Sequence, residues 1–133
     1  MEENFIGQVT QKAVLMHKGA FVLVREKNED LWILPGGRLQ VGEKPEAGLL
    51  REIQEELGVD AAVESIISVD TYHGGAESKT PKFFVFYRAS VLPNQEISIQ
   101  NEIADVALIS KKEELEMYPT YPNYKAVIEQ FLA

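Results

Sequence analysis

Residues 32–59 have the sequence WILPGGRLQVGEKPEAGLLREIQEELGV and predict a strand, a glycine loop and an acidic helix in succession. The apolar run at residues 31–34 is followed by Pro35, which cannot donate a hydrogen bond to a neighbouring strand. Gly36 and Gly37 come next and can adopt positive φ. We therefore expect a short strand over residues 31–34 that ends where the glycine loop begins.

A helix is expected to follow this loop. Pro45 suits the first helical position, and Glu46 favours the positive end of the helix dipole, although Lys44 is a poor N-cap. Gly58 predicts the end of the helix. The helical repeat places Glu52, Glu55 and Glu56 on one face. The opposite arc is expected to pack on a sheet, and it consists of Ala47, Leu50, Ile53 and Leu57.

Three crowded carboxylates repel one another, which raises the pKa of at least one of them unless a cation keeps them ionised. A hard divalent ion such as Mg²⁺ accepts carboxylate, carbonyl and water oxygens, so it is the cation that this pattern favours. Gly48 lies on the same face, where its missing side chain is expected to leave room for a bulky anion. Taken alone, however, a Glu-rich helix is usually just a solvent-exposed face.

The spacing across the whole stretch decides between these interpretations. It matches the signature G-x5-E-x7-R-E-U-x-E-E-x-G-U, where U is aliphatic, at Gly37, Glu43, Arg51, Glu52, Ile53, Glu55, Glu56, Gly58 and Val59. Background frequencies of roughly 5 to 7% for each fixed residue make a chance match on the order of one in 10⁸ per starting position. The stretch resembles the Nudix hydrolase family, and outside it the likeness is one of general pattern.

The resemblance implies an α/β fold, namely an α/β/α sandwich with a mixed β-sheet in which the signature forms a loop-helix-loop. It also implies Mg²⁺-dependent hydrolysis of a pyrophosphate bond in a nucleoside diphosphate linked to another group, X, with Mn²⁺ as a substitute ion. In that reaction, water attacks a phosphorus atom and a phosphate-containing fragment leaves.

The resemblance also assigns roles to residues. Metal ligands are expected at Glu52, Glu56, the Gly36 carbonyl and, in some relatives, Glu55. The catalytic residues are then Glu52, Glu55, Glu56 and Arg51, with Glu55 or Glu52 as the proton acceptor and Arg51 orienting carboxylates. Glu43 is expected to have a structural role.

Substrate contacts are expected from Arg25, Gly37, Arg38 and Glu102, and Glu96 and Asp105 compete with Glu102 for the role of an additional acid. His73 in a glycine-rich loop and Lys79 and Lys82 are more simply explained as solvated side chains. The aromatic side chains that could stack on a nucleobase more often belong to a core, and they are Tyr72, Phe84, Tyr118 and Tyr121.

The rest of the chain predicts further elements around this stretch. Two strands at residues 12–17 and 20–25 are joined by a tight hairpin at Lys18 and Gly19. Strands are also expected at residues 61–72, 82–91 and 106–109, a helical turn at 111–115 and an amphipathic helix at 124–132. No repeat or linker divides the chain, so we expect one Nudix hydrolase domain over residues 1–133.

The amino-acid composition excludes several classes of binding partner. A net charge of −8 and a pI near 4.8 argue against polymeric nucleic acid, which selects a basic surface. The absence of cysteine excludes a disulfide framework. The first residues show neither a basic flank nor a long apolar run, so we expect no signal peptide, no membrane association and a cytoplasmic protein. A small-molecule nucleotide is the expected partner, and the sequence leaves homodimerisation open.

The identity of X is less defined. In the family, a proline or a tyrosine shortly after the signature is associated with ADP-sugars or dinucleoside polyphosphates, but Gly74 and Ala76 stand at those places. A nucleoside triphosphate or a small nucleotide derivative is the favoured substrate, with ADP-sugars and dinucleoside polyphosphates as alternatives. Two other functions remain open: a nucleotide-sensing domain without catalysis, and an isopentenyl diphosphate isomerase-like enzyme, against which the absence of cysteine counts.

Overall fold

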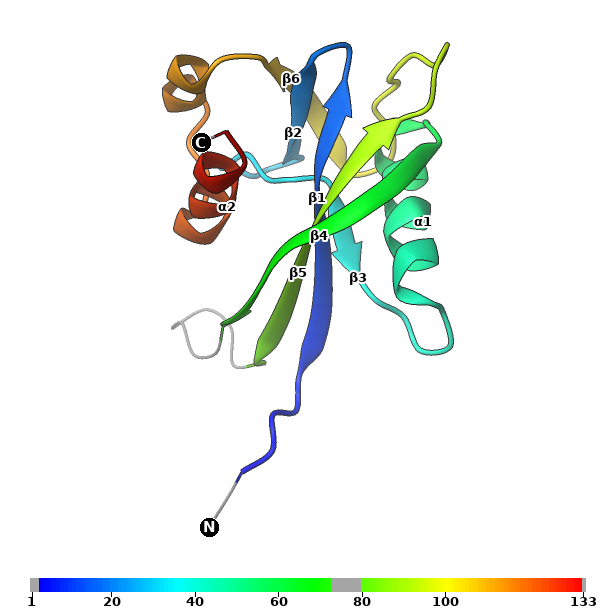
Figure 1. Ribbon diagram of the computed structural model, residues 1–133, viewed down its shortest axis with the longest axis vertical. Helices are drawn as coiled ribbons and strands as arrows, with labels where there is room; N and C mark the ends of the chain where they lie inside the picture. The colour runs from blue at the N-terminus through cyan, green and yellow to red at the C-terminus, as the bar shows by residue number, and fades with distance from the viewer. Residues whose placement is uncertain (1–2, 73–79, 133) are drawn as a thin grey trace.

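The computed structural model describes residues 3–72 and 80–132, which form one mixed sheet with helices on both faces (Figure 1). The strands are β1 (Gln8–His17), β2 (Ala20–Glu26), β3 (Gly36–Arg38), β4 (Ala61–Tyr72), β5 (Lys82–Val91) and β6 (Ile103–Ile109). The helices are α1 (Pro45–Leu57), the 3-10 helix η1 (Lys112–Met117) and α2 (Pro122–Leu132). The expected α/β/α sandwich is confirmed.

The strand order in the described part of the chain is β4-β5-β1-β2-β6, and β3 pairs with β1 beside β2. Strands β1 and β5 run parallel, whereas the other strand pairs are antiparallel. The predicted hairpin at Lys18 and Gly19 is confirmed, and both residues have positive φ, of 52° and 80°. Such angles match the twist of a two-residue β-hairpin.

Strand β1 has two successive partners along one edge. Near the hairpin, Met16 and His17 pair with β2. Further from the hairpin, residues 10–12 pair with β3 instead, in the register Thr10↔Arg38 and Lys12↔Gly36. The chain therefore places the glycine loop directly against the middle of the sheet.

The expectation of a strand at residues 31–34 is wrong, because Trp32 and Ile33 form isolated bridges and the strand lies at the glycines. The reason is the closeness of β1. A Cβ atom on Gly36, whose φ is 136°, would lie 2.0 Å from the carbonyl oxygen of Gln11. Gly36, which looks like a strand breaker, is thus what allows this strand to pair with β1.

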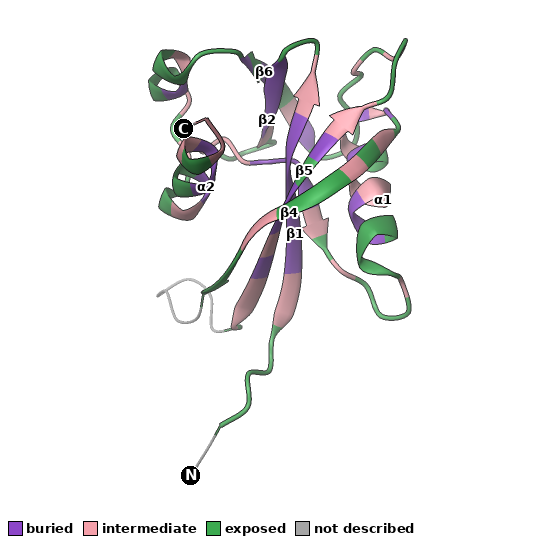
Figure 2. Cartoon of the chain, in the orientation of Figure 1, coloured by how far each residue is buried: buried purple, intermediate pink, exposed green. Residues whose placement is uncertain are grey.

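The two faces of the sheet bury separate cores, as the alternation of side chains along a strand requires. Leu23 and Phe86 pack with Val127 and Ile128 of α2 on one face. On the other face, α1 covers a second core that includes Ala13, Leu15 and Val22. Figure 2 shows the buried residues concentrated in the strands between the helices.

The buried face of α1 differs from the expected one. Leu49, Ile53 and Leu57 are fully buried at a spacing of four residues, whereas Ala47 is exposed and Leu50 is half-buried. The helix is therefore rotated relative to the prediction, and Gly48 is buried as well.

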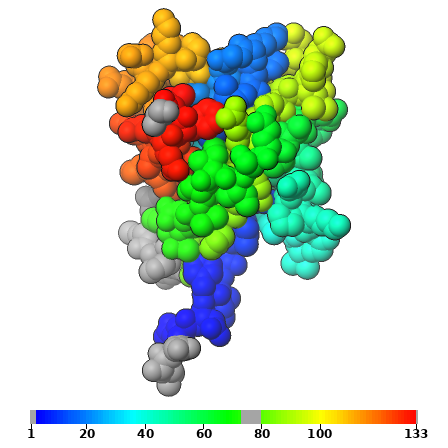
Figure 3. All heavy atoms as spheres, viewed as in Figure 1, coloured from blue at the N-terminus to red at the C-terminus, as the bar shows by residue number. Residues whose placement is uncertain are grey.

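Several elements are longer than expected. Strand β1 begins at Gln8 because β5 continues to pair with it as far as Lys82. Strand β6 begins at Ile103 and α2 at Pro122, so both start before the predicted residues. Figure 3 shows residues 3–7, which precede β1, extending beyond the rest of the domain. Within residues 3–72 and 80–132, no helix has the length and apolarity needed to cross a membrane.

The observed orientation of α1 predicts different costs for two neighbouring leucines. Leu49→Ala should lower the free energy of unfolding by about 2 to 5 kcal/mol, since it leaves a cavity in a fully buried site. Leu50→Ala should cost less than half as much, because Leu50 is only half-buried. Urea unfolding of both variants measures the difference, and equal or reversed costs would contradict this orientation.

Candidate active site

A cavity of about 1350 Å³ lies where β1 passes from β2 to β3. Its wall combines Thr10 and Lys12 of β1, the glycine loop at residues 36–41 and three carboxylates of α1. Further lining comes from β5 and from the start of α2, through Lys82, Phe84 and residues 121–124. The cavity thus gathers polar groups from segments distant in sequence.

The beginning and the end of α1 are both tied to other parts of the chain. Gln11 of β1 donates a hydrogen bond of 2.7 Å from its side-chain nitrogen to the carbonyl oxygen of Pro45. At the other end, Asn101 donates to the carbonyl of Glu55 at 2.8 Å, and the Gln100 N–H donates to that of Glu56 at 3.0 Å. The bonds to Glu55 and Glu56 satisfy carbonyls that the end of a helix leaves unpaired. Together with the bond to Pro45, they fix the direction in which the acidic face points.

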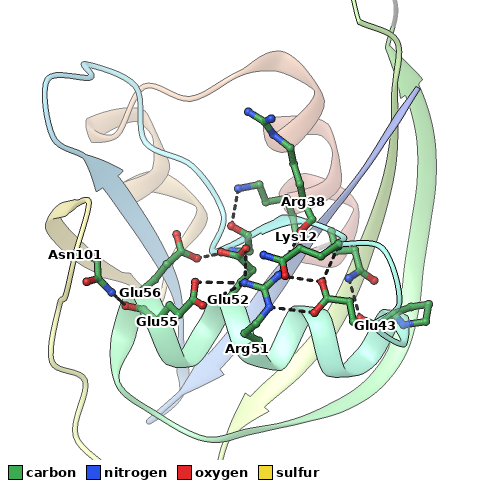
Figure 4. A network of polar contacts seen from close by, with 12 residues as sticks. Lys12, Arg38, Glu43, Arg51, Glu52, Glu55, Glu56 and Asn101 are labelled. Carbon is green, nitrogen blue, oxygen red and sulfur yellow. Dashed lines mark hydrogen bonds and ion pairs between the residues drawn. The ribbon is translucent and has the colours of Figure 1, made fainter. Parts of the chain in front are cut away.

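Arg51 connects the loop to this acidic face (Figure 4). Its guanidinium donates two hydrogen bonds to the Glu43 carboxylate, at 2.9 and 3.0 Å, and further bonds to Glu52 at 3.0 Å and Glu55 at 3.3 Å. The Glu43 carboxylate also accepts the Gln40 N–H at 2.7 Å. The contacts with Arg51 and Gln40 lower the pKa of Glu43, whereas bonding to Glu43 raises that of Arg51. The expected structural role of Glu43 agrees with this geometry.

Gly48 has a different role from the one expected. A Cβ atom there would lie 2.8 Å from a carboxylate oxygen of Glu43 and 3.1 Å from the side chain of Leu39. The space that the missing side chain leaves is therefore taken by Glu43 and is not available to a bound anion. The expectation that Gly48 makes room for a ligand is wrong.

The peptide unit of Gly36 lies between α1 and β1. Its N–H donates to a carboxylate oxygen of Glu56 at 2.7 Å, and its carbonyl accepts a hydrogen bond from Lys12 Nζ at 3.2 Å. The neighbouring Gly37 lies against Glu52, since a Cβ atom there would be 2.5 Å from the carboxyl carbon of that side chain. The two glycines thus let both carboxylates lie directly on the loop.

Glu56 is the most perturbed acid in this group. Burial raises its pKa to about 7, although Lys12 and the Gly36 N–H oppose the shift, while the charges of Glu52 and Glu26 add to it. Burial also lowers the pKa of Lys12, and the charge of Glu56 opposes that shift. A carboxylate that is held in a cavity beside other acids is typical of a site that receives a cation.

The donor set fits a hard cation. Within the described residues, no three His, Cys, Asp or Glu side chains alone are arranged to hold a metal ion. Glu52 and Glu56 together with the Gly36 carbonyl form a mixed set of oxygen donors around one loop. Oxygen donors of this kind suit Mg²⁺, which keeps several of its own water ligands. Glu55 is half exposed and pairs with Arg51, so it lies at the edge of this set.

The other expected site residues separate into two groups. Gly37, Arg38 and Glu102 line the cavity. Arg25 is not among the described lining residues, because its guanidinium donates to the Glu29 carbonyl at 3.0 Å and lies over the ring of Trp32.

Glu96 pairs with Lys18 and Asp105 accepts the N–H of Val106, so of the three competing acids Glu102 is the one that faces the cavity. Four residues considered above from the sequence lie outside the described residues, namely His73, Gly74, Ala76 and Lys79.

The aromatic candidates divide in the same way. Tyr72, Phe84 and Tyr121 line the cavity, whereas Tyr118 packs edge-on against Trp32 with ring centroids 5.0 Å apart. The lining residues that were not anticipated include Lys12, Glu26, Asn101 and Tyr124. Lys12 could have been noticed, because it is a charged residue that directly precedes a run of apolar residues predicted to be a strand.

Comparisons with known proteins agree with this geometry. A sequence model described as NUDIX domain matches residues 8–131. "Putative ADP-ribose pyrophosphatase YjhB" of Bacillus subtilis (strain 168) is 31% identical over 58% of this chain and 36% of its own length. "Nucleoside triphosphatase NudI" of Salmonella newport (strain SL254) is 35% identical over 65% of this chain and 66% of its own length.

A solved structure of a UDP-X diphosphatase superposes with a TM-score of 0.78 at 25% identity, covering 98% of this chain and 64% of that one. The matches with the two curated relatives thus span between about a third and two thirds of those proteins.

The raised pKa of Glu56 predicts how stability depends on pH in protein freed of metal by a chelator. The folded protein binds this proton more tightly than the unfolded chain, so the stabilisation is present below pH 4.5 and is lost as the pH rises through about 7. Glu56→Gln, which cannot ionise, should gain up to about 3 kcal/mol of unfolding free energy over the wild type between pH 4.5 and pH 8. Urea unfolding across this range tests it, and a pH-independent difference between the two proteins would refute it.

Proposed function

The chain belongs to the NUDIX domain family, and from that premise and the geometry of the cavity we propose that it is a metal-dependent pyrophosphohydrolase acting on small nucleotides. Its reaction is the hydrolysis of a pyrophosphate bond in a nucleoside diphosphate linked to X. Single-domain organisation over residues 1–133 and cytoplasmic localisation stay predictions from the sequence, and homodimerisation stays open.

One observation carries the proposal. Glu52 and Glu56 lie against a Gly-Gly loop in a cavity wall, where Glu56 accepts the Gly36 N–H at 2.7 Å and burial raises its pKa. A carboxylate in that environment is stabilised by a divalent cation, as is a pyrophosphate group. The same cavity is large enough for a nucleotide, since ligand sites commonly occupy roughly 300 to 1,000 Å³.

The chain's own residues then have distinct tasks. Glu52, Glu56 and the Gly36 carbonyl would hold Mg²⁺, with Mn²⁺ as a substitute, and Glu55 would contribute at the edge of the site. When bound, the ion would supply charge neutralisation on the pyrophosphate and orientation of the attacking water. Arg51 keeps Glu52 and Glu55 in place through the bonds described above, and the Gly36 N–H holds Glu56. Glu55 or Glu52 would accept the proton of the water.

The other walls of the cavity support a nucleotide as the substrate. Arg38 and Lys82 supply positive charge, while Tyr72, Phe84 and Tyr121 supply aromatic surface on which a base can stack. We favour a nucleoside triphosphate or a small nucleotide derivative, and the similarity to a nucleoside triphosphatase supports this choice. Glu102 faces the same cavity and would contact the substrate or act as an additional acid.

Removal of the Glu56 charge tests the reaction. Glu56→Gln should lower Mg²⁺-dependent turnover by about 10²- to 10³-fold, because the amide is a poorer ligand for the cation. Glu116→Gln makes the same chemical change on an exposed residue of η1 and should leave turnover unchanged. Wild-type turnover in Glu56→Gln would refute the proposal.

A substrate panel separates the remaining alternatives. Nucleoside triphosphates, ADP-ribose, other nucleotide sugars and dinucleoside polyphosphates are offered with Mg²⁺ and with Mn²⁺, and product release is measured. The proposal expects the highest kcat/KM for a triphosphate or a small nucleotide derivative. Binding of these compounds without any product would instead indicate a nucleotide-sensing domain.

A further inference from the structure

Lys12 is a buried lysine in the wall of the catalytic cavity. Lys12 is 6% exposed, and it lines the same cavity as the carboxylates of α1. Lysine is seldom fully buried, because removal of an ammonium from water is costly unless other groups compensate for it. The burial of a charged lysine at this position therefore needs an explanation.

The surroundings of Lys12 compensate for its charge only in part. The hydrogen bond of its ammonium to the Gly36 carbonyl is 3.2 Å long, and the ammonium also faces the ring of Tyr124 at 5.9 Å. Glu56, Glu26 and Glu52 act on it through their charges without a direct ion pair in the described residues. An ammonium has three donors, so it retains capacity for an anion in the cavity.

The hydrogen bond to Gly36 also conflicts with the proposed metal site. The Gly36 carbonyl is one of the expected oxygen ligands of Mg²⁺, and two cations on a single oxygen repel one another. A bound ion would therefore weaken the contact of Lys12 with this carbonyl. The ammonium would then be available at the bottom of the cavity, beside the ion.

The other positively charged side chains near the carboxylates are less suited than Lys12 to bind an anion beside the ion. Arg51 is engaged with Glu43, Glu52 and Glu55. Arg38 and Lys82 also line the cavity, but they are exposed and half-buried respectively. Among the described lining residues, Lys12 is thus the cation that is both buried and close to the proposed metal ligands.

We propose that Lys12 is a substrate-binding residue whose ammonium moves from the Gly36 carbonyl to a phosphate oxygen of the bound substrate. The pyrophosphate group would then lie between the carboxylate-bound ion on one side and this ammonium on the other. This inference rests on the proposed function, and it adds to that function a phosphate contact on the sheet side of the cavity.

The test uses methylenediphosphonate, a pyrophosphate analogue that cannot be hydrolysed, and measures its binding by calorimetry in the presence of Mg²⁺. Lys12→Met should weaken binding by about 10- to 100-fold, since one hydrogen bond between charged groups is lost. Lys112→Met removes the same charge from an exposed position in η1 and should bind the analogue like the wild type. Binding of Mg²⁺ alone should be as tight in Lys12→Met as in the wild type, or tighter.

Two results would overturn the inference. The first is unchanged binding of the analogue in Lys12→Met. The second is an equal loss of Mg²⁺ binding and analogue binding, which would mean that Lys12 only supports the Gly36 loop. If Lys12→Met does not fold, a crystal structure of the wild type with Mg²⁺ and methylenediphosphonate tests the inference instead. Lys12 Nζ should then lie within hydrogen-bond distance of a phosphonate oxygen, and its continued contact with the Gly36 carbonyl would refute the inference. Because no turnover is needed, these results are distinct from a failure of the proposed hydrolysis.

Discussion

The close approach of the Gly36 backbone to β1 is the constraint on which the other features depend. A side chain at Gly36 would overlap the Gln11 carbonyl, so the loop can enter the sheet only as glycine. This placement brings one peptide unit between β1 and α1, where its N–H meets Glu56 and its carbonyl meets Lys12. The same approach lets Glu52 lie over Gly37. Fold and candidate site are therefore specified by the same two residues.

Helix α1 meets two requirements at once. Leu49, Ile53 and Leu57 bury one face against the sheet, while the adjoining face directs Glu52 and Glu56 to the loop. Arg51 and Glu43 keep the loop and that face together. The arrangement is unfavourable for Glu56, whose ionised form is desolvated and lies near other acids. A cation would relieve this cost, so the feature that weakens the metal-free protein near neutral pH is also the one that suits catalysis.

Sequence patterns predicted the class of fold and the elements of the sheet, because alternation and glycine or proline signals are local. They failed at residues 31–34 and at Gly48, where the outcome depends on a neighbouring segment. The glycines pair as a strand since β1 lies against them, and Gly48 accommodates Glu43. The spacing from Gly37 to Val59 identified the carboxylates of the cavity in advance. Lys12 was missed because its proximity to Glu56 comes from the pairing of β1 with β3, which sequence spacing does not reveal.

The proposed hydrolysis requires that Glu52, Glu56 and the Gly36 carbonyl together bind a divalent metal ion. Anomalous diffraction from crystals soaked in Mn²⁺ tests it most directly, because the ion is located independently of activity and substrate. We expect a manganese peak in contact with both carboxylates and with the Gly36 oxygen. A peak elsewhere in the cavity, or no peak at saturating Mn²⁺, would contradict it.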